Sequence, residues 1–213
     1  MVKIKSPPDH SLATLCDADF QAISDLLPLL CCGEEAAATA FVRLANTPSF
    51  DDETNAALRV IGAEEEIHLA LLIELATKLP APNCDPSTLR ASRVFHLKLA
   101  RGGATLHLAR IAAIDAAVCT ILSRLLARPG PIGRNTQLSR LFMRIRSDES
   151  RHVAIARSTI RAEADRSALR DAAANAREGL AALLEPTGSV FEALGVDPDA
   201  LIRVVRGLPN GLL

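Results

Sequence analysis

Apolar residues recur every three to four positions over most of the chain, and this spacing is typical of amphipathic α-helices. The repeats predict four long helices, because proline, glycine and short polar stretches interrupt the pattern between them. The expected helices span about 17–46, 50–79, 104–127 and 136 to beyond 160. Pro28 lies inside the first helix and is expected to kink or restart it. Ser49 is the expected N-cap of the second helix.

Shorter helices are predicted outside this set. The pair Asp85-Pro86 favours a helix start, so a separate helix is expected from there to Arg101, between the second and third long helices. Further helices are expected at about 167–184, 189–194 and 197–206. No segment alternates between polar and apolar residues as a strand would. The sequence therefore predicts an all-α fold, a four-helix bundle with an extra helix between core helices 2 and 3 and additional C-terminal helices.

The chain is expected to divide into three parts. Residues 1–16 contain the helix-breaking stretch Ser6-Pro-Pro-Asp and are expected to form a flexible N-terminal arm. Residues 17–165 are expected to form the bundle, and residues 166–213 a helical extension packed on it.

Each of the four long helices carries an acidic residue on its apolar face. In the first helix, for example, Glu34 lies seven residues after Leu27 and seven before Phe41. Buried carboxylates are costly unless they are paired or bound to metal, so four of them, on four helices, indicate a common cause. The four acids are Glu34, Glu65, Asp115 and Glu149.

Two of these acids begin a Glu-x-x-His sequence, which ends at His68 in the second helix and at His152 in the fourth. Residues three apart lie on one helix face, so both side chains of each pair can reach one metal ion. Two such pairs, with one carboxylate from each of the other two helices, make a site for two iron or manganese ions. A single Glu-x-x-His on a solvated face is common by chance. Two on apolar faces, each preceded by an acid 31 or 34 residues upstream, are not.

These motifs resemble those of the ferritin-like di-iron carboxylate superfamily, which includes ferritins, rubrerythrins and ribonucleotide reductase small subunits. Asp148-Glu-Ser-Arg-His152 is similar to the Asp/Glu-Glu-x-x-His motif of that superfamily, and Glu64-Glu-Glu-Ile-His68 is a second copy with Ile67 in place of Arg. Gly33-Glu34, with Phe41 seven residues after the acid, is similar to the first helix of rubrerythrins. The resemblance covers about Glu34 to His152.

The resemblance implies a ligand set for two iron ions, or for one manganese and one iron ion. Glu34 would be a terminal or bridging ligand, and Glu65 would bridge the two ions. Asp115 is shorter than the Glu usual at its position. Glu34 is favoured over Glu35 by both the apolar stripe and the resemblance. The implied ligands are Glu34, Glu65 and His68 for one metal, and Asp115, Glu149 and His152 for the other.

Five neighbouring residues have open roles. Glu64 and Asp148 resemble acids that hold a ligand histidine through its other ring nitrogen. Arg151 either completes that network or forms a surface ion pair. His107 either lines a pocket or is a partly buried or surface histidine, and Cys119 either lines the pocket or is a small core residue.

Composition narrows the function. Hydrophobic residues make up 49% of the chain but aromatic residues only 3%, with six Phe and no Tyr or Trp, so a stored tyrosyl radical is excluded. The five cysteines include no Cys-x-x-Cys pair, which excludes a rubredoxin-like electron donor. The expected function is a di-iron or Mn/Fe oxidase or oxygenase that uses O2 to oxidise a small organic substrate. The alternatives are a ferroxidase that handles iron, and a binding or structural protein with a vestigial metal site.

The expected partners are O2, a small molecule and, as a further candidate, an external electron donor. A formal net charge of −1 argues against nucleic acid. A mean hydropathy of +0.19 favours an apolar surface buried in a homodimer. No window approaches 18 uninterrupted apolar residues, so no membrane span is expected. Without a secretory signal, and with unpaired thiols, a cytoplasmic location is expected.

Overall fold

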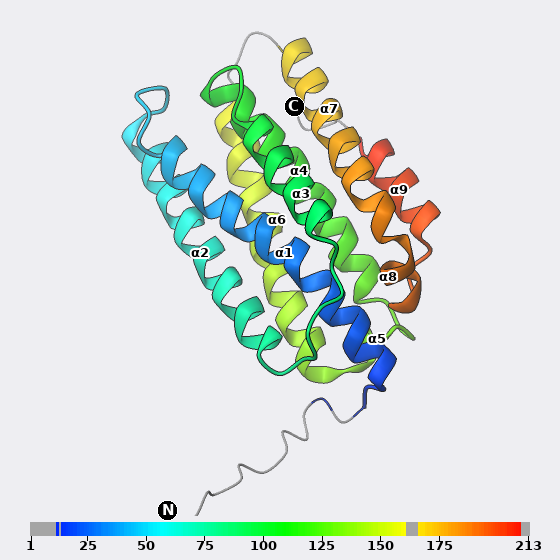
Figure 1. Ribbon diagram of the computed structural model, residues 1–213. Helices are drawn as coiled ribbons and strands as arrows, with labels where there is room; N and C mark the ends of the chain where they lie inside the picture. Colours follow the sequence, from blue (N-terminus) through cyan, green and yellow to red (C-terminus); the bar gives the residue numbers. More distant parts are fainter. Residues whose placement is uncertain (1–11, 13, 161–165, 210–213) are drawn as a thin grey trace, which may run out of the picture.

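A computed structural model describes residues 12, 14–160 and 166–209 of the chain. The described residues are helical or lie in turns and loops, and none forms a strand, so the predicted all-α class is confirmed. Four long helices lie side by side (Figure 1). They are α1 (Asp17–Leu44), α2 (Asp52–Ala76), α4 (Ala104–Leu125) and α6 (Thr136–Ile160).

The four long helices form two antiparallel hairpins, α1 with α2 and α4 with α6. Between the hairpins the chain runs back along the molecule through α3 (Pro86–Leu99), so that α2 and α4 run in the same direction (Figure 1). Asp85 caps α3 through a hydrogen bond that its carboxylate accepts from the Ser87 amide, as the Asp-Pro pair predicts. A short helix that the sequence pattern did not reveal, α5 (Pro131–Arg134), lies in the connection between α4 and α6.

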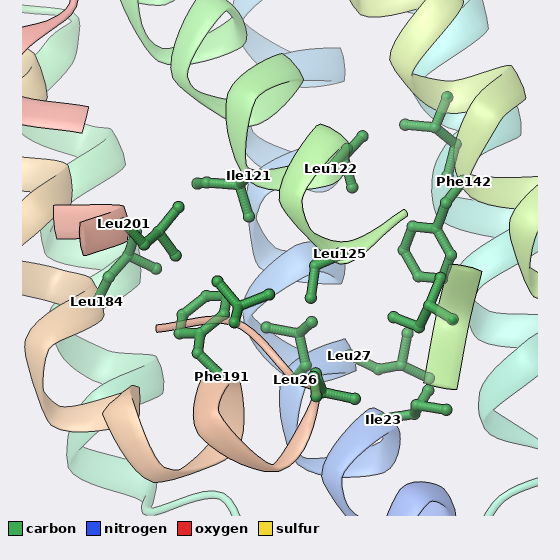
Figure 2. Packing of buried hydrophobic residues seen from close by; sticks show 14 of the residues in the cluster. Ile23, Leu26, Leu27, Ile121, Leu122, Leu125, Phe142, Leu184, Phe191 and Leu201 are labelled. Carbon is green, nitrogen blue, oxygen red and sulfur yellow. The ribbon is translucent and has the colours of Figure 1, made fainter. Parts of the chain in front are cut away.

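The C-terminal helices complete the core rather than only covering it. Helix α7 (Arg166–Leu184) packs along α4 and also contacts α3. A short 3-10 turn, η2 (Glu185–Thr187), leads to α8 (Gly188–Ala193), which packs against α1, and α9 (Pro198–Gly207) packs on α7. Phe191 of α8 lies among side chains of α1, α4, α7 and α9 (Figure 2).

Two local predictions differ from the structure, and a third is largely outside the described residues. Pro28 lies within the continuous helix α1, so the expected restart is wrong. The N-cap of α2 is Asp51 rather than Ser49, because its carboxylate accepts a 2.8 Å hydrogen bond from the Thr54 amide. Most of the expected N-terminal arm lies outside the described residues, but Leu12 and Leu15 are buried in the core.

The apolar core consists of two clusters, separated by a polar layer. On α1, Leu27 belongs to one cluster and Phe41 to the other, and Glu34 lies midway between them. On α6, Ile145 and Ala156 flank the layer in the same way. The acids on the predicted apolar faces therefore meet at one level inside the bundle, roughly halfway along the helices.

Helix α4 is long and apolar enough to cross a membrane, judged by length and composition alone. In this structure 61% of its most apolar window is buried inside the protein. A core helix passes the same test, so this is weak evidence for a membrane span, and the expectation of none stays a prediction.

The packing of Phe191 can be tested by substitution, since its side chain is 1% exposed. We expect Phe191→Ala to lower the free energy of unfolding by about 3–5 kcal/mol, because it removes buried apolar contacts and leaves a cavity. Leu97→Ala is the control, because Leu97 is 71% exposed. Chemical denaturation measures both, and equal small effects would show that α8 is not part of the core.

Candidate metal centre

All four acids predicted from the apolar stripes are buried in the polar layer. Glu65 is the most enclosed, at 1% exposed, and Glu149 is 3% exposed. Glu34 is buried whereas Glu35 is exposed, which decides between these neighbours in favour of Glu34. Both histidines of the Glu-x-x-His pairs, His68 and His152, are fully buried.

One group of four side chains can hold a metal ion. Glu34, Glu65, His68 and Glu149 each offer a ligand atom, and these atoms lie within 4.8 Å of one another. The Nδ1 atom of His68 is 3.4 Å from an oxygen of Glu34, 3.4 Å from one of Glu65 and 3.6 Å from one of Glu149. The group draws on α1, α2 and α6, so it depends on the packing of both hairpins.

The second histidine faces the same two central carboxylates. Nδ1 of His152 lies 2.9 Å from Oε1 of Glu65 and 3.8 Å from Oε2 of Glu149. In each carboxylate one oxygen therefore faces His68 and the other faces His152. Asp115 is buried near Glu149 and Glu65 but is not among the four grouped side chains.

Several inward-facing atoms lack hydrogen-bond partners among the described residues. Despite the short distances, the contacts between the histidine Nδ1 atoms and the carboxylates do not have hydrogen-bond geometry. Buried polar atoms in proteins almost always have a partner, so several unsatisfied atoms at one point indicate a ligand. Carboxylate and imidazole donors suit iron and manganese. The unsatisfied atoms are Glu65 Oε1, His68 Nδ1, Asp115 Oδ2 and His152 Nδ1.

The outer nitrogen of each histidine is held by an acid from the opposite hairpin. Nε2 of His68 lies 3.1 Å from Asp148, and Nε2 of His152 lies 2.9 Å from Glu64. Arg151 donates hydrogen bonds to both acids and so joins them. When Nε2 donates its hydrogen to the acid, Nδ1 is left to bind metal. The interpretation of Glu64 and Asp148 as histidine-holding acids agrees with these contacts, and Arg151 completes the network.

The electrostatics of the site follow from burial and close packing. Burial and neighbouring carboxylates raise the pKa values of Glu34 and Asp115 well above their usual range. Although burial opposes it, contacts with Glu149 raise the pKa of His68 to about 12 and that of His152 to about 10. Without a metal, the positive charges of the two protonated imidazole rings therefore balance the charge of the carboxylates. A metal ion bound at the Nδ1 atoms would replace the protons that these rings carry.

A cavity of about 100 Å³ opens on the α1 and α4 side of the centre. Glu34, Asp115 and Glu149 lie in its wall, and most of the remaining wall is apolar. His107 also lines it, which agrees with the pocket alternative for that residue. Cys119 is not among its lining residues, since Sγ lies 3.5 Å from the Ser150 hydroxyl on α6.

Side chains from outside the long helices also line this cavity. Ser92 and His96 of α3 contribute to it, as do Leu180 and Leu183 of α7. The sequence motifs did not identify these residues, because they are not spaced like metal ligands along the chain. They reach the cavity only through tertiary packing.

No protein-family model matches this chain, and a comparison with curated proteins finds no significant similarity. What the site can do is therefore inferred from its side chains and from the motifs that place them.

The acids behind the histidines should control metal affinity. We expect Glu64→Gln and Asp148→Asn each to weaken metal binding by roughly 10–100-fold, because each change removes the charge that orients a ligand imidazole. Glu66→Gln is the matched control, since Glu66 is exposed on the same helix as Glu64. Competition with a chelator of known affinity measures the effect. Affinities equal to that of the control would contradict this role.

Metal binding should release protons. The raised pKa values of His68 and His152 keep both imidazoles protonated at pH 7, and a ligand imidazole must lose its Nδ1 proton. The affinity for Fe(II) or Mn(II) is therefore expected to rise between pH 6 and pH 8. Calorimetry in buffers of different ionisation enthalpy counts the released protons. An affinity that falls with pH would contradict the assigned protonation.

Proposed function

We propose that this protein is a ferritin-like di-metal oxidase or oxygenase, which holds two iron ions, or one manganese and one iron ion, and uses O2 to oxidise a small organic molecule. The observation that carries the proposal is the position of Glu65 and Glu149, each with one oxygen toward His68 and the other toward His152. Carboxylates that face two histidines in this way suit a pair of ions better than a single ion.

The helix order supports the same proposal. Two antiparallel hairpins joined by one long crossover is the arrangement of ferritin-like bundles. In this chain the crossover contains α3, and the acid-then-Glu-x-x-His order occurs once in each hairpin.

The proposed ligand roles follow from the side-chain positions. Glu34 and His68 would complete one metal site, and Asp115 and His152 the other, with Glu65 and Glu149 between the two sites. Aspartate has one methylene fewer than glutamate, so the carboxylate of Asp115 would reach less far toward a metal bound beside His152 than a glutamate would.

The bound metals would supply the electrons that reduce O2, and the chain supplies the environment. Glu64 and Asp148 hold the imidazoles in orientation, and the two apolar clusters enclose the polar layer at both ends of the bundle. The chain has no Tyr or Trp that the oxidant could attack instead of a substrate. The mainly apolar cavity beside Glu34 and Asp115 favours an organic substrate over Fe(II), whose path would need polar ligands.

Three further properties are part of the proposal. We propose a homodimer, which the exposed apolar residues Val60 and Ile67 on α2 support, and a cytoplasmic location. An oxygenase reaction also requires an external electron donor. No nucleic acid or membrane is proposed as a partner.

Metal content tests the proposal. We expect anaerobically reconstituted protein to hold two Fe or Mn ions per chain, and Glu65→Ala and Glu149→Ala to lose most of both, because each residue contacts both histidines. Glu66→Ala is the control, and circular dichroism checks that the variants fold. Elemental analysis near zero for the wild type, or unchanged in both variants, would contradict the proposal.

The ferroxidase alternative is separated by adding Fe(II) and O2 in large excess. An oxidase or oxygenase keeps its stoichiometry of two metals, whereas an iron-storing protein accumulates a mineral core. Iron that accumulates far beyond two ions per chain would favour iron handling and contradict the oxygenase proposal.

A further inference from the structure

A second hollow lies outside the cavity, between α1 and α3. This vestibule has a volume of about 310 Å³ and is more open than the inner cavity. Ala36, Ala40, His96 and His107 line both spaces, so the vestibule and the inner cavity meet at these four residues. The two spaces together form a path from the surface to the wall that contains Glu34 and Asp115.

The charged side chains of the vestibule carry a positive excess. Arg43 of α1 and Arg93 of α3 line it, both are exposed, and neither side chain makes an ion pair or hydrogen bond with any residue that the structure describes. Glu35 is the single acid among the lining residues. Burial lowers the pKa values of His96 and His107 to about 4, so neither ring adds charge at neutral pH.

The junction of the two spaces holds a buried polar group without a partner. His107 is 8% exposed, and its ring makes no hydrogen bond within the described part of the chain. Arg43 is close enough to contribute to its lowered pKa. Its ring nitrogens are not among the fully enclosed polar atoms that lack a partner, so they are open to the junction and can hydrogen-bond to a polar group of a ligand there.

The inner cavity suits a short apolar group. Its volume of about 100 Å³ is smaller than the cavity of about 150 Å³ that holds one benzene ring in an engineered protein core. Leu, Ile, Val and Ala make up most of its wall beyond the acids of the candidate metal centre. A short chain of at most about four carbons is therefore the expected occupant of the inner cavity, and the carbons nearer the head lie at the junction.

We propose that the substrate is a short amphipathic carboxylate, bound with its anionic head in the vestibule between Arg43 and Arg93 and its apolar tail in the inner cavity. The neutral ring of His107 then lies at the junction, where its N–H can donate a hydrogen bond to the carboxylate oxygen nearer the cavity. The far end of the tail lies against the wall formed by Glu34, Asp115 and Glu149. Oxidation of that end rests on the function proposed above, but binding of the carboxylate does not.

Binding to metal-free protein, prepared with a chelator, tests the head-group position. Butanoate, hexanoate, octanoate and the matching alcohols are titrated by calorimetry. We expect hexanoate to bind at least tenfold more tightly than hexanol, and Arg43→Gln and Arg93→Gln each to weaken hexanoate roughly fivefold without changing hexanol, because an arginine–carboxylate contact is lost. Arg144→Gln is the control, since Arg144 is exposed on α6 and does not line either space.

Three outcomes of these titrations would overturn the inference. Equal affinities for acid and alcohol, or arginine variants that bind hexanoate like the control, would show that the vestibule does not hold the head. Binding of carboxylates only after metal loading would place the head at the metal centre, and would also overturn it.

Ala40→Leu provides an independent test of the tail position, because Ala40 lines both the vestibule and the inner cavity. We expect it to weaken hexanoate and hexanol alike by narrowing the junction, and an unchanged affinity for hexanoate would contradict a tail in the inner cavity. Metal stoichiometry is measured separately, on portions of the same preparations reconstituted anaerobically with Fe(II). A protein that takes up two metals but does not bind hexanoate would refute this inference and leave the proposed function standing. A protein that binds hexanoate but takes up no metal on reconstitution would do the reverse.

Discussion

The burial of four carboxylates at one level of an apolar bundle is the constraint on which the rest of this structure depends. Burying an isolated ionised carboxylate costs much free energy, and neighbouring negative charges increase that cost. In this fold His68 and His152 lie among the acids, and their positive charge offsets the negative charge of the carboxylates. Because the acids come from α1, α2, α4 and α6, all four helices must hold their register for the charges to balance.

The same constraint explains the network behind the histidines. Each ring is held by an acid on the other hairpin, and Arg151 joins Glu64 to Asp148, so the network links α2 to α6 as well as orienting the rings. Although partial burial opposes it, the hydrogen bonds of Glu64 with Arg151 and of Asp148 with His68 and Arg151 keep the pKa values of both acids low, so both remain anionic. On the opposite side, α3 and α7 cover the space between α1 and α4, and the cavity beside the centre lies there.

The helices and the central side chains were predictable because both depend on local spacing. An acid at the phase of an apolar stripe, such as Glu34 between Leu27 and Phe41, must point into the core once the helix forms. The pairing of His68 with Asp148 joins positions 80 residues apart in sequence, and only tertiary packing decides it. The same holds for Asp51, which lies nearer the start of α2 than Ser49 and therefore caps it.

The proposed function requires that Glu65 and Glu149 lie between two metal ions when the site is loaded. Anomalous X-ray diffraction from crystals grown anaerobically with Fe(II) tests it most directly. We predict two anomalous peaks about 3.5–4 Å apart, one beside Nδ1 of His68 and the other beside Nδ1 of His152. A single peak, peaks only at the protein surface, or none within the polar layer would contradict the claim.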